Sequence, residues 1–153
     1  MTTRFKRQFL LVVSLLTALV LFSAIPHAHA ASSGRLISQT KERIDADTYI
    51  ITTLYDTTTA RSSKTGSKSI SYYHDGKTAW TLTVCGEFAS SGSTYSCVGD
   101  SVTYSTSGLW SCTSARSSHS STTATAYGTF TAIGVQTVSD SISISCDSKG
   151  NLS

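Results

Sequence analysis

The sequence is poor in proline, in charge and in motifs that carry chemistry. It has one proline, and 14% of its 153 residues are charged. The nine acidic residues are scattered, so no pair of carboxylates suggests a glycosidase cleft. There is no C-x-x-C pattern of a metal or redox site, and no G-x-S-x-G context that would orient a nucleophilic serine. We therefore predict a non-enzymatic protein with no catalytic residues, no cofactor and no metal.

The N-terminal segment has the layout of a secretory signal peptide. Arg4, Lys6 and Arg7 precede an apolar run over residues 9–25, and Pro26 and the triplet 28–30 (Ala-His-Ala) follow it. We expect residues 1–30 to form a signal helix that is removed by cleavage after Ala30. An uncleaved membrane anchor is the alternative. Without these residues nine Lys and Arg face nine Asp and Glu, so the exported chain is neutral.

The remaining chain is rich in hydroxyl side chains, because Ser and Thr make up roughly two in five of its residues. Such side chains are compatible with strands but bury little apolar area. Its length suits one domain. We expect residues 31–46 to be a flexible polar lead-in and residues 47–153 to be a single all-β domain, an antiparallel β-sandwich or a partly closed barrel.

The clearest local signal is Asp75-Gly76 between two β-like runs, which predicts a hairpin turn. The alternation that follows places one set of side chains on the core face: Trp80, Leu82, Val84 and Phe88. A second hairpin is expected to turn through residues 89–92. In the last strand Ile142, Ile144 and Cys146 should face inward. The polar stretches 57–69 and 113–123 are predicted to be exposed loops.

The four cysteines favour two disulfides in an oxidising compartment. If the turn at 89–92 keeps an even register, Val84 opposes Cys97. In that register Cys97 and Cys146 both face the core and would pair, which leaves Cys85 to pair with Cys112. A one-residue bulge would instead set Cys85 opposite Cys97 and leave Cys112 with Cys146.

One resemblance covers roughly residues 70–153. The run from Trp80 through Gly86 to Phe88, the Gly92 hairpin with Cys97, and the ending 146–153 resemble small, uncharacterised, secreted, Ser/Thr-rich β proteins of Gram-positive bacteria. The resemblance implies export and a β fold. It implies no activity and no site residue.

Few side chains offer chemistry. His74 and His119 remain after cleavage, and both are expected on the surface. Glu87 is the one carboxylate expected in the middle of a strand. Aromatic rings on an exposed sheet can stack on sugars, and Trp110 and Tyr73 are the candidates for such stacking.

These observations support a secreted, extracellular protein with a binding or structural role. The sequence does not identify the partner; an extracellular glycan or another protein is the expectation, and neutrality argues against nucleic acid and against a membrane surface. The alternatives are a carbohydrate-binding module, a small secreted hydrolase and a bacteriocin-like toxin. The hydrolase would need His74 or His119 beside a serine or a carboxylate in a concave site.

Overall fold

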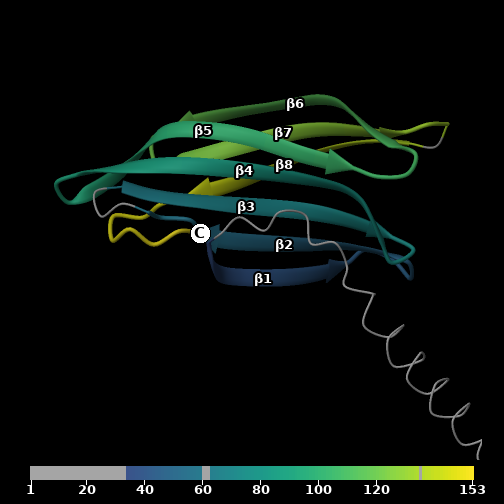
Figure 1. The fold of residues 1–153 in the computed structure, drawn as a ribbon, viewed down its shortest axis with the longest axis horizontal. Helices are drawn as coiled ribbons and strands as arrows, with labels where there is room; N and C mark the ends of the chain where they lie inside the picture. The colour runs from purple at the N-terminus through teal and green to yellow at the C-terminus, as the bar shows by residue number, and fades with distance from the viewer. Residues whose placement is uncertain (1–33, 60–62, 135) are drawn as a thin grey trace, which may run out of the picture. The chain divides into compact units, whose positions relative to one another are not determined.

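The computed structural model describes residues 34–59, 63–134 and 136–153, and in these residues it is all-β, without a helix. Eight strands follow one another along the chain (Figure 1). They are β1 (Arg35–Arg43), β2 (Thr48–Asp56), β3 (Ser63–His74), β4 (Lys77–Ser91), β5 (Thr94–Thr106), β6 (Trp110–Ser120), β7 (Thr123–Ala132) and β8 (Gln136–Ser145). They form two antiparallel sheets, β1-β2-β3-β4-β5 and β6-β7-β8. The predictions of an all-β fold and of antiparallel strands are confirmed.

Neighbouring strands in each sheet are also neighbours in the sequence, so each connection is a hairpin. The turn between β3 and β4 is the one predicted at Asp75-Gly76. His74 pairs with Lys77, and the two turn residues have φ angles of 50° and 70°. Left-handed backbone at both central positions is what a type I′ turn requires, and Asp-Gly tolerates it.

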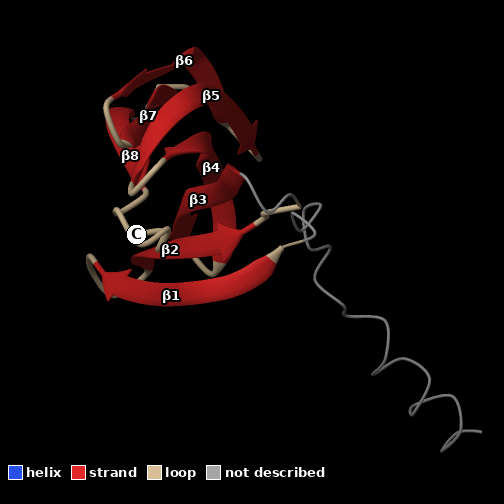
Figure 2. Cartoon of the chain, turned by 90° about the vertical axis from the view of Figure 1, so that its left-hand side faces the viewer, coloured by secondary structure: helices blue, strands red, loops and turns tan. Residues whose placement is uncertain are grey.

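The two sheets pack against each other through β3, β4 and β5 on one side and β7 and β8 on the other (Figure 2). The predicted core face of β4 is confirmed, because all four of its large side chains are buried: Trp80, Leu82, Val84 and Phe88. The facing sheet contributes alanines and two large side chains: Ala124, Ala126, Phe130 and Ile144. Small residues on β7 leave room for the large rings of β4.

Aromatic rings fill one end of this core. Trp80 lies between Phe130 and Tyr72, with ring centroids 4.4 and 5.5 Å away and nearly parallel planes. Offset stacking of this kind adds about 0.5–1.5 kcal/mol per pair to the burial term. The indole nitrogen of Trp80 has no hydrogen-bond partner among the described residues.

The sheets do not close into a barrel. β5 and β6 lie next to each other and join the two sheets, but no ladder of hydrogen bonds connects these strands in the described part of the chain. The partly closed barrel of the sequence analysis is therefore not the observed form; the observed arrangement is two separate sheets.

The structure corrects the expected lead-in. Residues 35–43 form β1, where a flexible segment over 31–46 was expected. All nine side chains of β1 are exposed, so the strand carries no apolar pattern that the sequence could reveal. Its place in the sheet comes from the backbone ladder with β2, which runs from the pair Arg35–Asp56 to the pair Arg43–Tyr49.

Two expected loops are largely strands. β3 begins at Ser63, inside the stretch 57–69, and β6 occupies most of 113–123. Ser and Thr suit strands at positions that face solvent, and β6 lies at the edge of its sheet. The low-complexity stretch 113–123 is therefore mostly an exposed strand and not a loop.

The strands of the hairpin between β4 and β5 extend further than expected, and the turn that joins them is shorter. The turn consists of Gly92 and Ser93, because Ser91 pairs with Thr94. With this turn Cys97 faces Phe88, and a register shift lies between Glu87 and Phe88. Neither predicted register is correct, since Cys97 lies opposite neither Val84 nor Cys85.

Candidate functional site

Every outward-facing residue of β7 and β8 carries a hydroxyl group. The intervening residues of β7 are buried, with exposed fractions of 0–5% at Ala124, Ala126, Phe130 and Ala132. The outward residues form five cross-strand pairs: Thr123–Ser145, Thr125–Ser143, Tyr127–Ser141, Thr129–Ser139 and Thr131–Thr137. We call these ten residues the hydroxyl face.

The hydroxyl groups of four of these pairs are hydrogen-bonded to each other. The oxygen–oxygen distances are 2.8 Å for Thr123–Ser145 and Thr125–Ser143, 3.0 Å for Thr129–Ser139 and 3.1 Å for Thr131–Thr137. A hydroxyl has one donor and two acceptor sites, so a single bond within the pair leaves each oxygen able to bind another molecule. The pairs fix the side-chain rotamers of the face.

Tyr127 lies at the centre of the hydroxyl face, and Arg116 lies beside it on the neighbouring strand. The guanidinium carbon of Arg116, on the neighbouring strand β6, lies 4.3 Å from the centroid of the Tyr127 ring, which is 37% exposed. This cation–π contact holds the planar guanidinium, with its N–H donors, beside the middle of the hydroxyl face. No outward-facing residue of β7 or β8 is acidic.

The outer face of the five-stranded sheet is also rich in hydroxyl groups, but it includes other side chains. Ser69 and Thr83 are 2.8 Å apart, and Ser71 and Thr81 are 2.9 Å apart. Cys85 lies on the same face of β4. This face is therefore less uniform than the hydroxyl face.

The two aromatic residues proposed for sugar stacking lie on different surfaces. Tyr73 is on the outer face of the five-stranded sheet, where its ring stacks on Tyr49 at 4.6 Å. Trp110 faces the interior, where it packs against the core at 5.8 Å from Tyr72. The structure does not bring Tyr73 and Trp110 into one site. Each ring already has an aromatic neighbour on one side.

His119 meets a carboxylate across the junction of the two sheets. Its Nδ1 contacts Oδ1 of Asp100 on β5. Hydrogen bonds from Ser117 and His119 lower the pKa of the Asp100 carboxyl group. The hydroxyl of Ser117 is bonded to the carboxylate rather than to the imidazole, so the three residues do not form a serine–base pair.

His74 contacts a buried threonine and the neighbouring turn residue. Its Nδ1 lies 3.1 Å from the hydroxyl of Thr48, and its Nε2 lies 3.8 Å from the carboxylate of Asp75. Thr48 is only 3% exposed, so a substrate could not reach its hydroxyl. Glu87 is exposed on the outer face of β4. No group of three His, Cys, Asp or Glu side chains that could hold a metal ion occurs in the described ranges.

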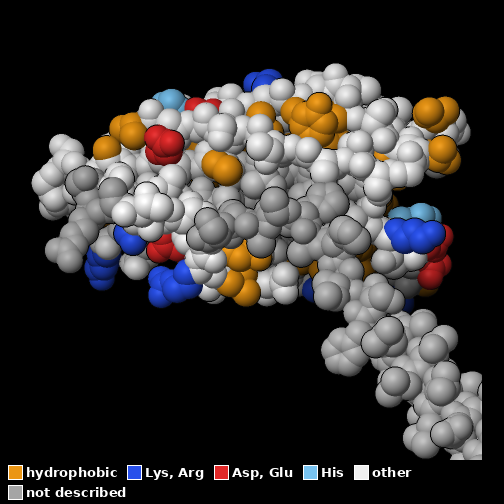
Figure 3. Space-filling view, in the orientation of Figure 1, with side chains coloured by type: hydrophobic (Ala, Val, Ile, Leu, Met, Phe, Trp, Pro, Cys, Tyr) orange, Lys and Arg blue, Asp and Glu red, His pale blue; other side chains and the backbone are white. Residues whose placement is uncertain are grey.

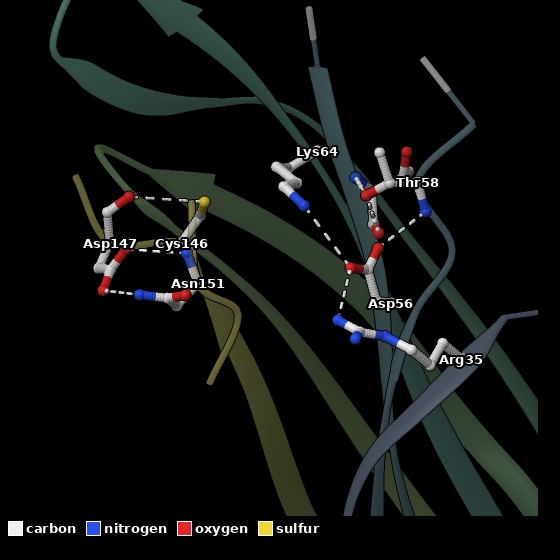
Figure 4. Close-up of polar contacts among 8 residues, drawn as sticks. Arg35, Asp56, Thr58, Lys64, Cys146, Asp147 and Asn151 are labelled. Carbon is white, nitrogen blue, oxygen red and sulfur yellow. Dashed lines mark hydrogen bonds and ion pairs between the residues drawn. The ribbon is translucent and has the colours of Figure 1, made fainter. Parts of the chain in front are cut away.

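Asp56, at one end of β2, makes several polar contacts (Figure 4). Arg35 and Lys64 approach its carboxylate to 3.7 and 3.6 Å, and the backbone N–H of Thr58 donates to it at 3.0 Å. The Thr58 side chain and these two cations lower the pKa of Asp56, and partial burial opposes the shift. These contacts join the ends of β1, β2 and β3.

All four cysteines are free thiols in the structure. Cys97 and Cys146 are buried in the core, with exposed fractions of 8% and 1%. Cys112 lies on the inner face of β6, opposite Phe130, whereas Cys85 lies on the outer face of β4. The structure therefore places Cys85 and Cys112 on different sheets and does not bring them together.

Charge is sparse on the visible surface. In Figure 3 small groups of basic and acidic side chains are separated by wide uncharged areas. No helix in the described residues is long and apolar enough to cross a membrane.

Comparison with known proteins gives no relative. No family model matches the chain, and neither a curated protein nor a solved structure is significantly similar to it. The site must therefore be interpreted from its chemistry. The abundance of Ser and Thr alone does not predict the hydroxyl face, although a signal for it is present: a hydroxyl-bearing residue stands at every second position over 123–132, and Ser does so over 139–145.

Proposed function

We propose that the chain is exported after loss of residues 1–30 and acts outside the cell as a non-enzymatic binding protein. We further propose that its ligand is a neutral polysaccharide, held by the hydroxyl face. One observation carries this proposal: all ten outward positions of β7 and β8 bear hydroxyl groups, and no carboxylate lies among them.

The chemistry of the face suits a sugar polymer. Sugar hydroxyls both donate and accept hydrogen bonds, as do the Ser and Thr hydroxyls opposite them. Alternate residues along a strand are about 6.8 Å apart and neighbouring strands about 4.8 Å apart, so the groups repeat regularly in two directions. A polymer with repeating hydroxyl groups could use several of them at once.

Tyr127 and Arg116 provide the orienting contacts. The Tyr127 ring offers an apolar surface for the C–H groups of a sugar, and the guanidinium offers several N–H donors in one plane. A net hydrogen bond contributes only about 0.5–1.5 kcal/mol, so binding should require several sugar units. Mono- and disaccharides should bind much more weakly than oligomers.

Nucleic acid fits this face poorly. Binding to a phosphate backbone depends on several Lys or Arg side chains, and Arg116 is the single cation beside the hydroxyl face within the described strands of this sheet.

The proposal is tested by isothermal titration of the secreted protein with neutral oligosaccharides of four or more units, representing plant and bacterial cell-wall glycans. We expect Tyr127→Ala and the pair Thr125→Val with Thr129→Val to lower affinity at least about tenfold, because each removes several contacts.

The matched control is Thr81→Val with Thr83→Val, which removes equivalent hydroxyl groups from the outer face of the other sheet. Its affinity should equal that of the parent protein. Equal losses in both variants, or no binding of the parent to any neutral glycan, would overturn the assignment.

A further inference from the structure

Two buried cysteines are hydrogen-bonded through their backbones to the turn between β6 and β7. Cys97 belongs to β5 in the first sheet, and Cys146 directly follows β8 in the second. The backbone N–H of Cys97 donates to the carbonyl of Ser121 at 2.6 Å, and that of Cys146 donates to the carbonyl of Thr122 at 3.0 Å. Ser121 and Thr122 are consecutive residues of the turn between β6 and β7. The two cysteine backbones are thus anchored to adjacent peptide groups.

Both side chains also face the same core. Cys97 lies opposite Phe88 in the register of β4 and β5, on the inward face. Cys146 continues the inward alternation of Ile144, and both residues belong to the central apolar cluster. The Cys97 thiol donates to the carbonyl of Gly99 at 3.4 Å, and the Cys146 thiol donates to the carbonyl of Asp147 at 3.7 Å. Figure 4 shows the contact of Cys146 with Asp147.

We propose that Cys97 and Cys146 form a disulfide in the mature protein, joining the two sheets at this turn. The in vivo part of this inference rests on the proposed export, because such bonds persist in oxidising compartments. Pairings of Cys85 with either of these cysteines are disfavoured by the fold. Cys85 faces away from the core, so it can reach neither Cys97 nor Cys146 without breaking the sheet.

The reaction is a thiol–disulfide exchange with a disulfide-bearing oxidant, either a small molecule or a protein. One cysteine thiolate attacks the oxidant, forms a mixed disulfide and releases one oxidant thiol. The second cysteine thiolate then attacks the mixed disulfide, forms the protein S–S bond and releases the other oxidant thiol. Two protein thiols are oxidised, the oxidant disulfide is reduced to two thiols, and two electrons are transferred.

The reaction should occur while the chain folds. Burial is the main cause that raises the pKa of both thiols above the ordinary value, and the neighbouring carboxylates act in the same direction. Since the thiolate is the reactive form, the folded, reduced protein should be oxidised much more slowly than the refolding chain.

The test is peptide mapping after refolding of residues 31–153 in oxidised glutathione, followed by alkylation of the remaining thiols. Trypsin alone cannot identify the bond, because no Lys or Arg lies between Lys77 and Arg116 and three cysteines remain in one peptide. Additional cleavage after Glu87 and after Trp110 separates those three cysteines.

We expect a peptide pair linked through Cys97 and Cys146, with Cys85 and Cys112 alkylated. The variant Cys85→Ser with Cys112→Ser should lose two hydrogens on oxidation, whereas Cys97→Ser with Cys146→Ser should lose none. A bond from Cys97 or Cys146 to another cysteine, or alkylation of both in the refolded chain, would overturn the proposal.

Mapping the protein collected from the culture medium separates this proposal from export. An intact N-terminus there would contradict cleavage after Ala30 but would leave the refolding result unaffected. A mature N-terminus with alkylated Cys97 and Cys146 would contradict the disulfide alone.

Discussion

Glycine on an inward face determines how closely the two sheets approach. A Cβ atom at Gly66 would lie 2.6 Å from a methyl carbon of Leu152 and 2.7 Å from one of Ile144. Both distances are shorter than real carbon contacts, and Gly66 is itself buried. The absence of a side chain at this position of β3 therefore allows the C-terminal residues to pack on the first sheet.

Gly66→Ala should destabilise the protein by about 1–3 kcal/mol, because the added methyl group overpacks this contact. The matched substitution is Gly99→Ala, where the nearest atom is the flexible carboxylate end of Glu87 at 3.2 Å. Denaturant unfolding of the two variants should show the larger loss at Gly66. Equal losses would show that the contact with Leu152 and Ile144 is not the cause.

The Asp56 contacts predict a pH-dependent contribution to stability. Because its pKa is lowered in the folded state, the ionised form stabilises the fold above the ordinary aspartate pKa, and this contribution disappears as the pH falls through the lower, folded-state value. Asp56→Asn should therefore reduce the free energy of unfolding at pH 7. The difference from the parent protein should shrink as the pH falls below about 4.

The matched control for this titration is Asp75→Asn, in an exposed turn. Its unfolding free energy should differ little from that of the parent protein at pH 7. A loss at Asp56 that stays constant down to about pH 2 would mean that its charge is not responsible.

Among the elements, the C-terminal segment after β8 adds a further pairing to the second sheet. Ser145 and Ser153 exchange two backbone hydrogen bonds of 3.0 Å, and Cys146 bridges to Leu152. The carboxylate of Asp147 accepts hydrogen bonds from the backbone of Lys149 and from Asn151, which shapes the intervening loop. These contacts lower the pKa of Asp147 and direct Leu152 into the core.

Leu152→Ala should cost about 2–5 kcal/mol, since it removes a buried side chain that is only 8% exposed. Leu109→Ala is the matched control, because Leu109 is 68% exposed in the turn before β6. Its effect should remain within about 0.5 kcal/mol. Thermal unfolding monitored by circular dichroism distinguishes the two, and similar losses would contradict the packing role of the C-terminal segment.

Elements that could be predicted from the sequence are those with one apolar face. Alternation along β4 and β8 identified Trp80, Leu82 and Ile144 as core residues, because burial of one face imposes a period of two. β1 and β6 escaped prediction because edge strands expose most of their side chains. Their position depends on backbone ladders with neighbours, and backbone hydrogen bonding leaves no pattern in the side chains.

For the whole molecule, the register between strands that are distant in the sequence could not be predicted from the sequence. The pairing of Phe88 with Cys97 depends on a two-residue turn and a register shift, and the anchoring of Cys97 and Cys146 to adjacent peptide groups depends on both sheets meeting at Ser121 and Thr122. The hydroxyl face likewise requires that β7 and β8 be neighbours with their Thr and Ser residues opposite one another. Composition reveals the abundance of these groups but not their alignment.

The core of the molecule is modest, so a covalent bond between the sheets should contribute substantially to its stability. A bond between Cys97 and Cys146 closes a loop of about 50 residues, for which chain-entropy models give about 4 kcal/mol. Reduction of the oxidised protein should then lower the midpoint of thermal unfolding by roughly 10–20 °C. The variant Cys85→Ser with Cys112→Ser should show the same shift, and Cys97→Ser with Cys146→Ser should show none. Calorimetry with and without a reductant measures the shift for the parent protein and for both variants. If reduction left the midpoint of the oxidised parent protein unchanged, apolar packing and backbone hydrogen bonds would hold the sheets together without the disulfide.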